Sequence, residues 1–150
     1  MEYTTLDPNL YISEEDTIRI YNVLLDNGQM KGSLKQEMMD HVLASSFSYE
    51  NLAEVAVLYS TKMDKTFKAM FFDKAIDKFV GNMPYLKEDT LYKILWSMFK
   101  AERLTSGGDF MQWFRVRSII QKRLKEFSPK VLTNILALST LAQKSEDKSD

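Results

Sequence analysis

The chain has 150 residues with 20 Lys and Arg, 21 Asp and Glu, one His and no Cys; 45% of its residues are hydrophobic and its net charge at pH 7 is −1. This length corresponds to about one domain, and the composition is that of an ordinary folded protein, which argues against a disordered or low-complexity chain. The lack of cysteine excludes disulfides, thiolate metal sites, iron–sulfur clusters and cysteine nucleophiles.

Residues 1–12 have no helical period and are expected to form an extended arm. Before Arg19 the chain carries acids and no base, the reverse of a secretory or mitochondrial leader, and no apolar run is long enough to predict a membrane span. We expect the arm and the acids after it to contact a protein partner, with packing of the arm against its own domain as the alternative. These candidate interface residues are Tyr3, Leu6, Leu10, Tyr11, Glu14 and Glu15.

The rest of the chain predicts about seven helices and no strand. A Ser or Asp before a helical apolar stripe marks a helix start, and Gly or Asn marks an end. The expected starts are Ser13, Ser33, Ser48, Asp64, Lys87, Asp109 and Ser128. The expected ends are Asn27, Ser46, Met63, Gly81, Ser106, Phe127 and residue 142. The fourth helix carries apolar residues over so wide an arc that neighbours must enclose it on more than one side.

One pattern recurs three times in the chain: a large apolar residue, a helix start, and apolar residues at the same turns. The copies begin at Phe47, Leu86 and Phe127, which are 39 and 41 residues apart. A helix pair repeated at this period cannot bury both its apolar faces alone, so the copies are expected to stack. We therefore predict an all-α fold of stacked helical hairpins over residues 13–142, like a short α-solenoid, and a solvated tail over 143–150. An irregular helix bundle is the alternative.

Residues 127–138, FSPKVLTNILAL, and more weakly residues 86–98, resemble the helical repeats of the FAST-kinase-like and octotricopeptide families, organellar proteins associated with RNA handling. The resemblance covers about half of the chain as a pattern of apolar positions. Those proteins are usually longer, and the carboxy-terminal RAP module often found with them has no counterpart here. The resemblance implies a mitochondrial setting more than it implies RNA binding; a cytoplasmic location is the alternative.

No residue pattern predicts a reaction, so we expect no enzyme. His41 is the only histidine, which removes any two-histidine metal site and leaves a catalytic triad without a nucleophile motif. No calcium loop, phosphate loop or dinucleotide fingerprint is present. We expect no metal, no cofactor and no small-molecule substrate, and we interpret His41 as a packing or interface residue.

Charge divides the chain into an acidic and a basic part. Residues 1–61 carry ten acids and three bases, whereas residues 62–130 carry fifteen bases and eight acids. If the fifth and sixth helices are neighbours, the bases on one face of each form a continuous positive strip. This candidate strip consists of Lys93, Lys100, Arg103, Arg115, Lys122 and Lys125. A solvated face, a protein contact and an RNA contact are the three interpretations of such a strip.

Nine Met, nine Phe and seven Tyr are more apolar and aromatic side chains than three short hairpins need. Met and aromatic residues are typical of adaptable protein interfaces. We therefore expect a non-catalytic structural or adaptor subunit that contacts other protein subunits of a larger assembly, with an RNA-binding helical-repeat protein as the alternative.

Overall fold

The computed structural model describes the backbone of residues 12–28, 30–44, 46–103 and 110–147. Within these ranges it describes the side chains of residues up to 103 and from 113 to 141. These residues form seven α-helices and two short 3-10 helices, and no strand occurs among them, so the predicted all-α class is confirmed. None of the described helices is long and apolar enough to span a bilayer. The α-helices are α1 (Glu14–Asp26), α2 (Gly32–Ala44), α3 (Tyr49–Lys62), α4 (Lys65–Asn82), α5 (Glu88–Lys100), α6 (Phe110–Arg123) and α7 (Pro129–Asp147).

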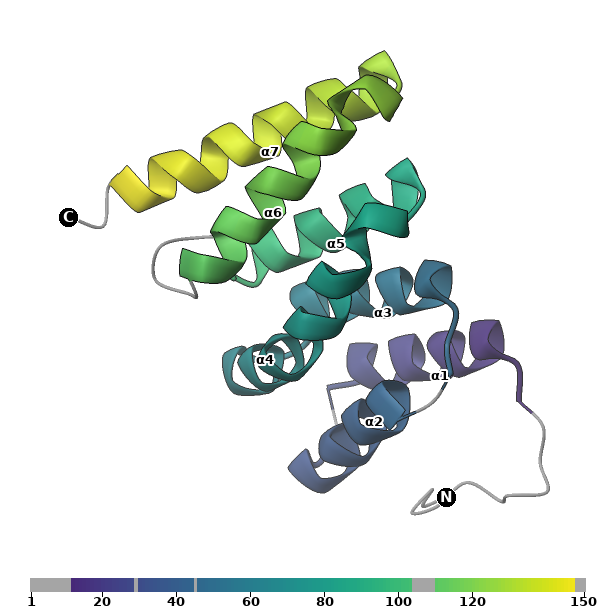
Figure 1. Ribbon diagram of the computed structural model, residues 1–150. Coiled ribbons are helices and arrows are strands. Elements are labelled where there is room, and N and C mark those ends of the chain that lie inside the picture. The colour runs from purple at the N-terminus through teal and green to yellow at the C-terminus, as the bar shows by residue number, and fades with distance from the viewer. Residues whose placement is uncertain (1–11, 29, 45, 104–109, 148–150) are drawn as a thin grey trace.

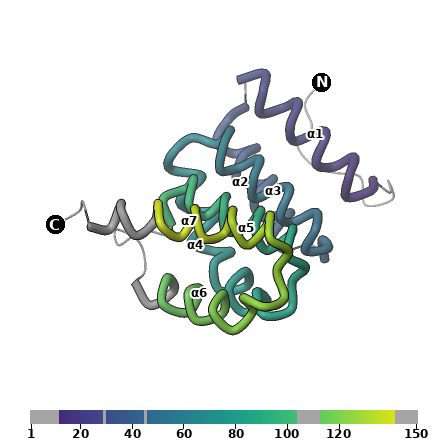
Figure 2. The backbone as a smooth tube through the Cα atoms, turned by 90° about the horizontal axis from the view of Figure 1, so that it is seen from above, coloured from purple at the N-terminus to yellow at the C-terminus, as the bar shows by residue number. Residues whose placement is uncertain are grey.

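The helices are arranged in two rows, and Figure 1 shows both. The odd-numbered helices pack in the order α1, α3, α5 and α7, and the even-numbered helices in the order α2, α4 and α6. Seen from above in Figure 2, α1 and α7 run in different directions, so the stack twists along its length. The architecture is the predicted stack of helical hairpins rather than an irregular bundle.

Corresponding residues at the first and third junctions of the odd-numbered row make the same contact. The backbone N–H of Ser48, just before α3, donates to the Glu14 carboxylate at the first position of α1 (2.7 Å). The backbone N–H of Ser128, just before α7, donates to the Glu88 carboxylate at the first position of α5 (2.7 Å). Each carboxylate thus accepts a hydrogen bond at the start of the next helix in its row. The hairpins therefore share one register.

The connections inside the hairpins also correspond. The 3-10 helices η1 (Met83–Tyr85) and η2 (Leu124–Glu126) each join an even-numbered helix to the following odd-numbered one. Leu86 and Phe127, which begin the second and third copies of the repeat, are both buried and both extended (φ −77°, ψ 148° and φ −81°, ψ 142°). Phe47 is half-buried. The predicted period is thus present in the backbone as well as in the apolar pattern.

Three helix starts follow from local side-chain chemistry. The side chains of Ser13, Ser48 and Asp64 each accept a hydrogen bond from a backbone N–H in the first turn of α1, α3 and α4, as predicted. The start of α2 differs from the prediction: the helix begins at Gly32, because the backbone N–H groups of Leu34 and Lys35 donate to the carbonyl of Lys31. Ser33 therefore lies inside the first turn and is not the cap.

The ends of α5, α6 and α7 differ most from the prediction. The helix α6 ends at Arg123 rather than at Phe127, because the 3-10 helix η2 follows it. The helix α5 ends at Lys100, before the predicted Ser106, because Glu102 adopts a left-handed conformation (φ 61°). The N–H groups of Glu102 and Arg103 then donate to the carbonyls of Phe99 and Met98, which is a Schellman motif. The helix α7 runs to Asp147, so its helical part includes residues 143–147 of the segment predicted to be a tail.

The centre of the stack is an aromatic cluster between α3 and α4. The rings of Tyr59 and Phe71 meet edge to face with centroids 4.8 Å apart, and Phe71 meets Phe72 in the same way at 5.1 Å. Phe79 also contacts both phenylalanines, and all four side chains are fully buried. Such pairs add about 0.5–1.5 kcal/mol each beyond their burial. The wide apolar arc of α4 is thus enclosed by α2, α3 and α6, as its width predicted.

Candidate protein-docking surface on the sixth helix

One side of α6 packs against the rest of the even-numbered row. Trp113, Val116 and Ile120 are buried at helical spacing, and α6 packs on α4 through this side. The guanidinium of Arg123 fixes the end of the helix, because its Nη1 donates to the carbonyl of Met83 (2.6 Å) and it lies over the Phe127 ring (5.3 Å to the centroid). The opposite side of α6 therefore has a defined orientation toward solvent.

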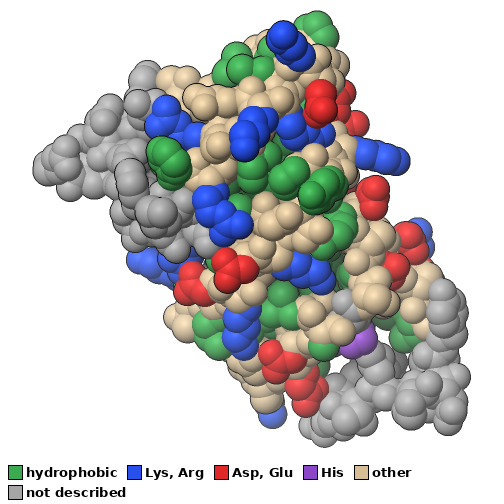
Figure 3. Space-filling view, viewed as in Figure 1, with side chains coloured by type: hydrophobic (Ala, Val, Ile, Leu, Met, Phe, Trp, Pro, Cys, Tyr) green, Lys and Arg blue, Asp and Glu red, His purple; other side chains and the backbone are tan. Residues whose placement is uncertain are grey.

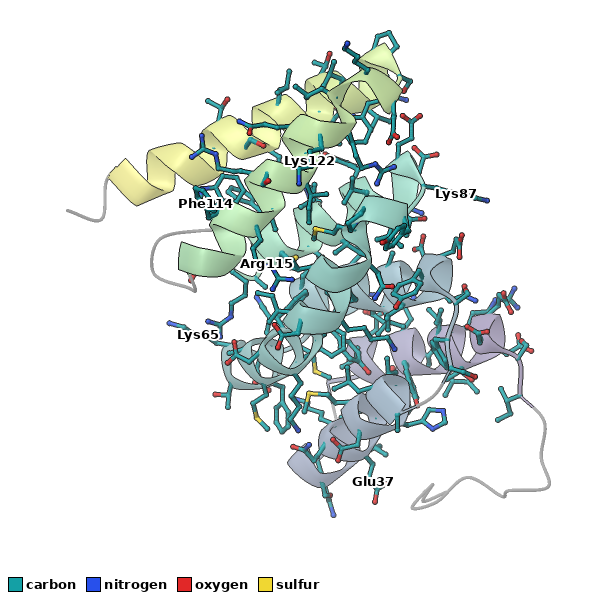
Figure 4. The ribbon with its side chains drawn as sticks, viewed as in Figure 1. Glu37, Lys65, Lys87, Phe114, Arg115 and Lys122 are labelled. Atoms are coloured by element: carbon teal, nitrogen blue, oxygen red, sulfur yellow. The ribbon has the colours of Figure 1, made fainter. Side chains whose placement is uncertain are left out.

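That opposite side combines an exposed aromatic ring with bases. Phe114 is 60% exposed, and the side chains of Arg115 and Lys122 are exposed on this side of the helix. Arg117, four residues after the buried Trp113, is exposed at its edge. Figure 3 shows Lys and Arg side chains spread over α6 on this face, whereas Asp and Glu side chains lie over α2, over α4 and at the upper right of the stack. Figure 4 shows Phe114, Arg115 and Lys122 on α6 and Glu37 on α2, at the other end of the stack. We call the following residues the α6 surface: Phe114, Arg115, Arg117, Lys122, Leu124 and Lys125.

The six predicted bases do not form one continuous strip. Lys93 and Lys100 lie on the outer side of α5, in the odd-numbered row, where Lys93 Nζ donates to the Glu54 carboxylate of α3. Arg103 forms an ion pair with Asp73 of α4 (3.5 Å). The prediction of a continuous strip is wrong because α5 and α6, although consecutive in the chain, belong to different rows.

The remaining three predicted bases are brought together. Arg115 and Lys122 lie on α6 and Lys125 lies in η2, which directly follows it. The candidate residues predicted from the sequence included neither Arg117 nor Phe114. The signal that could have placed Phe114 outside is its spacing from Ser118 and Lys122, since residues four apart share one side of a helix.

The acidic candidates at the amino-terminal end are engaged inside the chain. Asn51 Nδ2 donates to the carboxylates of Glu14 and Glu15 (3.2 Å each), and Glu14 also accepts from the Ser48 amide. These acids hold α1 against α3. The other predicted interface residues, Tyr3, Leu6, Leu10 and Tyr11, lie outside the described residues.

His41 lies between two aromatic rings at the surface of α2. Its ring meets those of Tyr21 and Phe47 edge to face, with centroids 6.4 and 6.2 Å apart. No group of three or more His, Asp or Glu that could hold a metal ion occurs among the described residues. The contacts of His41 are those of a packing residue, in agreement with its interpretation from the sequence.

A shallow pocket of about 230 Å³ lies where the ends of α1 and α3 meet the starts of α2 and α4. Its charged groups pair with charged groups of the chain: Lys35 with Asp64 (2.9 Å) and Lys62 with Asp26 (2.6 Å). The hydrogen bond from Lys35, and then the one from the Phe67 amide, lower the pKa of Asp64. The pocket is smaller than a typical ligand site of 300–1,000 Å³, and its charges are already paired.

No protein-family model matches this chain, and no similar protein was found among curated sequences or solved structures. The resemblance to the FAST-kinase-like and octotricopeptide repeats therefore stays a prediction.

Proposed function

We propose that this protein is a non-catalytic structural or adaptor subunit that docks an acidic protein partner on the α6 surface within a larger assembly. The observation that carries the proposal is the exposure of Phe114 among the bases of α6. A ring exposed to this extent gains little from burial within the chain, whereas it can supply a large contact area to a partner.

The composition of the α6 surface is that of an interface core. Aromatic residues and arginine are enriched where partners bury their contacts, and such residues contribute most of the binding free energy. The bases around the ring would attract an acidic partner and fix its orientation. The net basic character is local: residues 113–141 carry six bases and one acid.

The proposal is tested by purifying the tagged full chain from its native source and quantifying the proteins that come with it. The double variant Phe114→Ala, Lys122→Glu should lose a specific partner at least about tenfold, which corresponds to the contribution of one interface hot spot. The control is Lys87→Glu, which makes the same charge change at an exposed lysine outside the α6 surface (Figure 4). Equal recovery of every partner by wild type and double variant would reject docking on this surface.

A mitochondrial location is part of the proposal and is supported only by the resemblance of the repeats. Cell fractionation and microscopy of the tagged chain test it. Co-fractionation with mitochondrial markers is the expected result, and a uniform cytoplasmic signal would reject it without affecting the docking proposal.

RNA binding is the second candidate, because the same ring beside Arg115 could stack on an unpaired base. An RNA binder that uses four bases of the α6 surface would lose affinity steeply with salt, with a slope of log K against log salt of about −3. Titration of single-stranded RNA across a salt series measures this slope. A docking subunit should bind RNA weakly at every salt concentration.

A further inference from the structure

Each junction inside the odd-numbered row joins the same two sides of the helix. The four helices can be aligned on the residue that directly precedes each of them: Ser13, Ser48, Lys87 and Ser128. The positions four and eight residues after it are 17 and 21 in α1, 52 and 56 in α3, 91 and 95 in α5, and 132 and 136 in α7. These residues lie on the side toward the next helix, which we call the forward side. They are buried in α1, α3 and α5, each of which has a following helix.

The side toward the preceding helix, which we call the backward side, is equally regular. Residues 20 and 23 of α1 correspond to 55 and 58 of α3, 94 and 97 of α5, and 135 and 138 of α7. These residues are buried in α3, α5 and α7, each of which has a preceding helix. Every junction thus closes a forward side with a backward side.

The two ends of the stack leave one side of each kind open. On the forward side of α7, Leu132 is half-buried and Leu136 is 49% exposed. On the backward side of α1, Ile20 is 45% and Val23 is 57% exposed. All four are apolar at positions whose counterparts are buried inside the stack. Terminal repeats of a helical stack normally carry a polar outer side to stay soluble, whereas in the part of the chain that the structure describes these two sides carry exposed apolar residues.

The two ends also have opposite charge. Residues 12–44 carry six acids and three bases, whereas residues 113–141 carry one acid and six bases. An end of one sign attracts the other end of a second copy and repels its own kind. Charge therefore favours contact between unlike ends over contact between two α7 ends or two α1 ends.

We propose that the chain associates head to tail with copies of itself, the forward side of α7 packing against the backward side of α1 of the next copy. The contact continues the odd-numbered row across the boundary between copies. Such an interface joins two different surfaces, so it propagates into a ring or an open helical array and does not stop at a dimer. The proposal does not depend on the partner of the α6 surface.

The acidic contact at the helix start is not required for this junction. Pro129 stands in α7 where Glu14 and Glu88 stand in α1 and α5. Tyr49 holds that position in α3, and α3 nevertheless packs closely on α5. A junction without the contact at the helix start therefore already exists within the chain.

Sedimentation velocity of the full chain over a wide concentration range tests the proposal. The average mass of the wild type should rise with concentration beyond that of a dimer. Leu136→Asp and Val23→Asp should each be monomeric alone, because each blocks one end. An equimolar mixture of the two should form dimers and nothing larger, because each variant keeps the end that the other lacks.

The matched control is Ala137→Asp, which places the same charge on the neighbouring outer side of α7 and should associate like the wild type. Thermal melting checks folding, and a variant that melts differently is replaced by Leu136→Ser or Val23→Ser. A wild type that stays monomeric at every concentration overturns the proposal. Association that survives in Val23→Asp but not in Leu136→Asp, or the reverse, indicates contact between like ends or capture of the amino-terminal arm and also overturns it.

Discussion

Glu102 ends α5 with a backbone conformation that residues with a Cβ adopt at a cost of roughly 1–2 kcal/mol. Replacing it by Gly removes this cost, whereas replacing it by Ala removes only the contacts of the Glu side chain. We expect Glu102→Gly to have a free energy of unfolding about 1 kcal/mol above that of Glu102→Ala. Urea denaturation of the two variants measures the difference directly.

Both variants lack the Glu side chain, so the difference in stability between them does not contain the contacts of that side chain. Equal stability of the Gly and Ala variants would mean that the left-handed turn after α5 is absent in solution.

Two buried tyrosines make the stability sensitive to alkaline pH. Burial raises the pKa of Tyr21 to about 12, and burial followed by the charge of Tyr21 raises the pKa of Tyr59 still further. The unfolded chain loses these protons near pH 10 while the folded chain keeps them, so the free energy of unfolding is unaffected below that pH and falls above it. The fall reaches at most about 1.4 kcal/mol per pH unit for each tyrosine.

The variant Tyr59→Phe isolates one of these two contributions. It should reduce the loss of stability between about pH 10 and pH 12 relative to the wild type. At neutral pH it should be at least as stable, because the Tyr59 hydroxyl is buried without a hydrogen-bond partner in the described part of the chain. Urea denaturation at a series of pH values gives both results; parallel curves for the two proteins would contradict a neutral, buried Tyr59.

At the scale of the elements, Asp64 joins the start of α4 to α2. Its carboxylate accepts from the Phe67 amide (3.0 Å) and from Lys35 Nζ (2.9 Å). Asp64→Asn keeps the cap but loses the exposed ion pair and should cost only a few tenths of a kcal/mol, whereas Asp64→Ala loses both and should cost about 1 kcal/mol. Thermal and urea unfolding rank the variants; an equal cost for Asn and Ala would assign the effect to the ion pair.

Elements that a characteristic side chain marks were predictable from the sequence, and those without such a mark were missed. Ser13, Ser48 and Asp64 each cap a helix through their own side chain, so each of these starts can be recognised from one residue and the turn that follows it. The end of α5 was missed because Glu102 occupies a position that normally favours Gly. The basic strip was misplaced because row membership depends on packing between repeats, which no short window of sequence contains.

On the scale of the whole molecule, the position of a helix in the stack should determine how often it opens. The helices α3 and α5 have neighbours on both sides in their row, whereas α1 and α7 have a neighbour on one side only. Because each repeat contacts only its neighbours, end helices can open without the middle of the stack. Amide hydrogen exchange in dilute solution should be slowest in α3 and α5; uniform protection of all odd-numbered helices would show that the stack opens only as a whole.

The shared register of the hairpins bears on how a chain of this kind can change in length. A duplication of the coding segment for residues 65–103 would place a second α5 after the first, and its backward side would meet the same apolar row that α7 now covers. An insertion of a few residues within a helix would instead rotate every later side chain off its row. Gene duplication can therefore lengthen this protein by whole hairpins of about forty residues, while smaller insertions are tolerated only in the connections between helices.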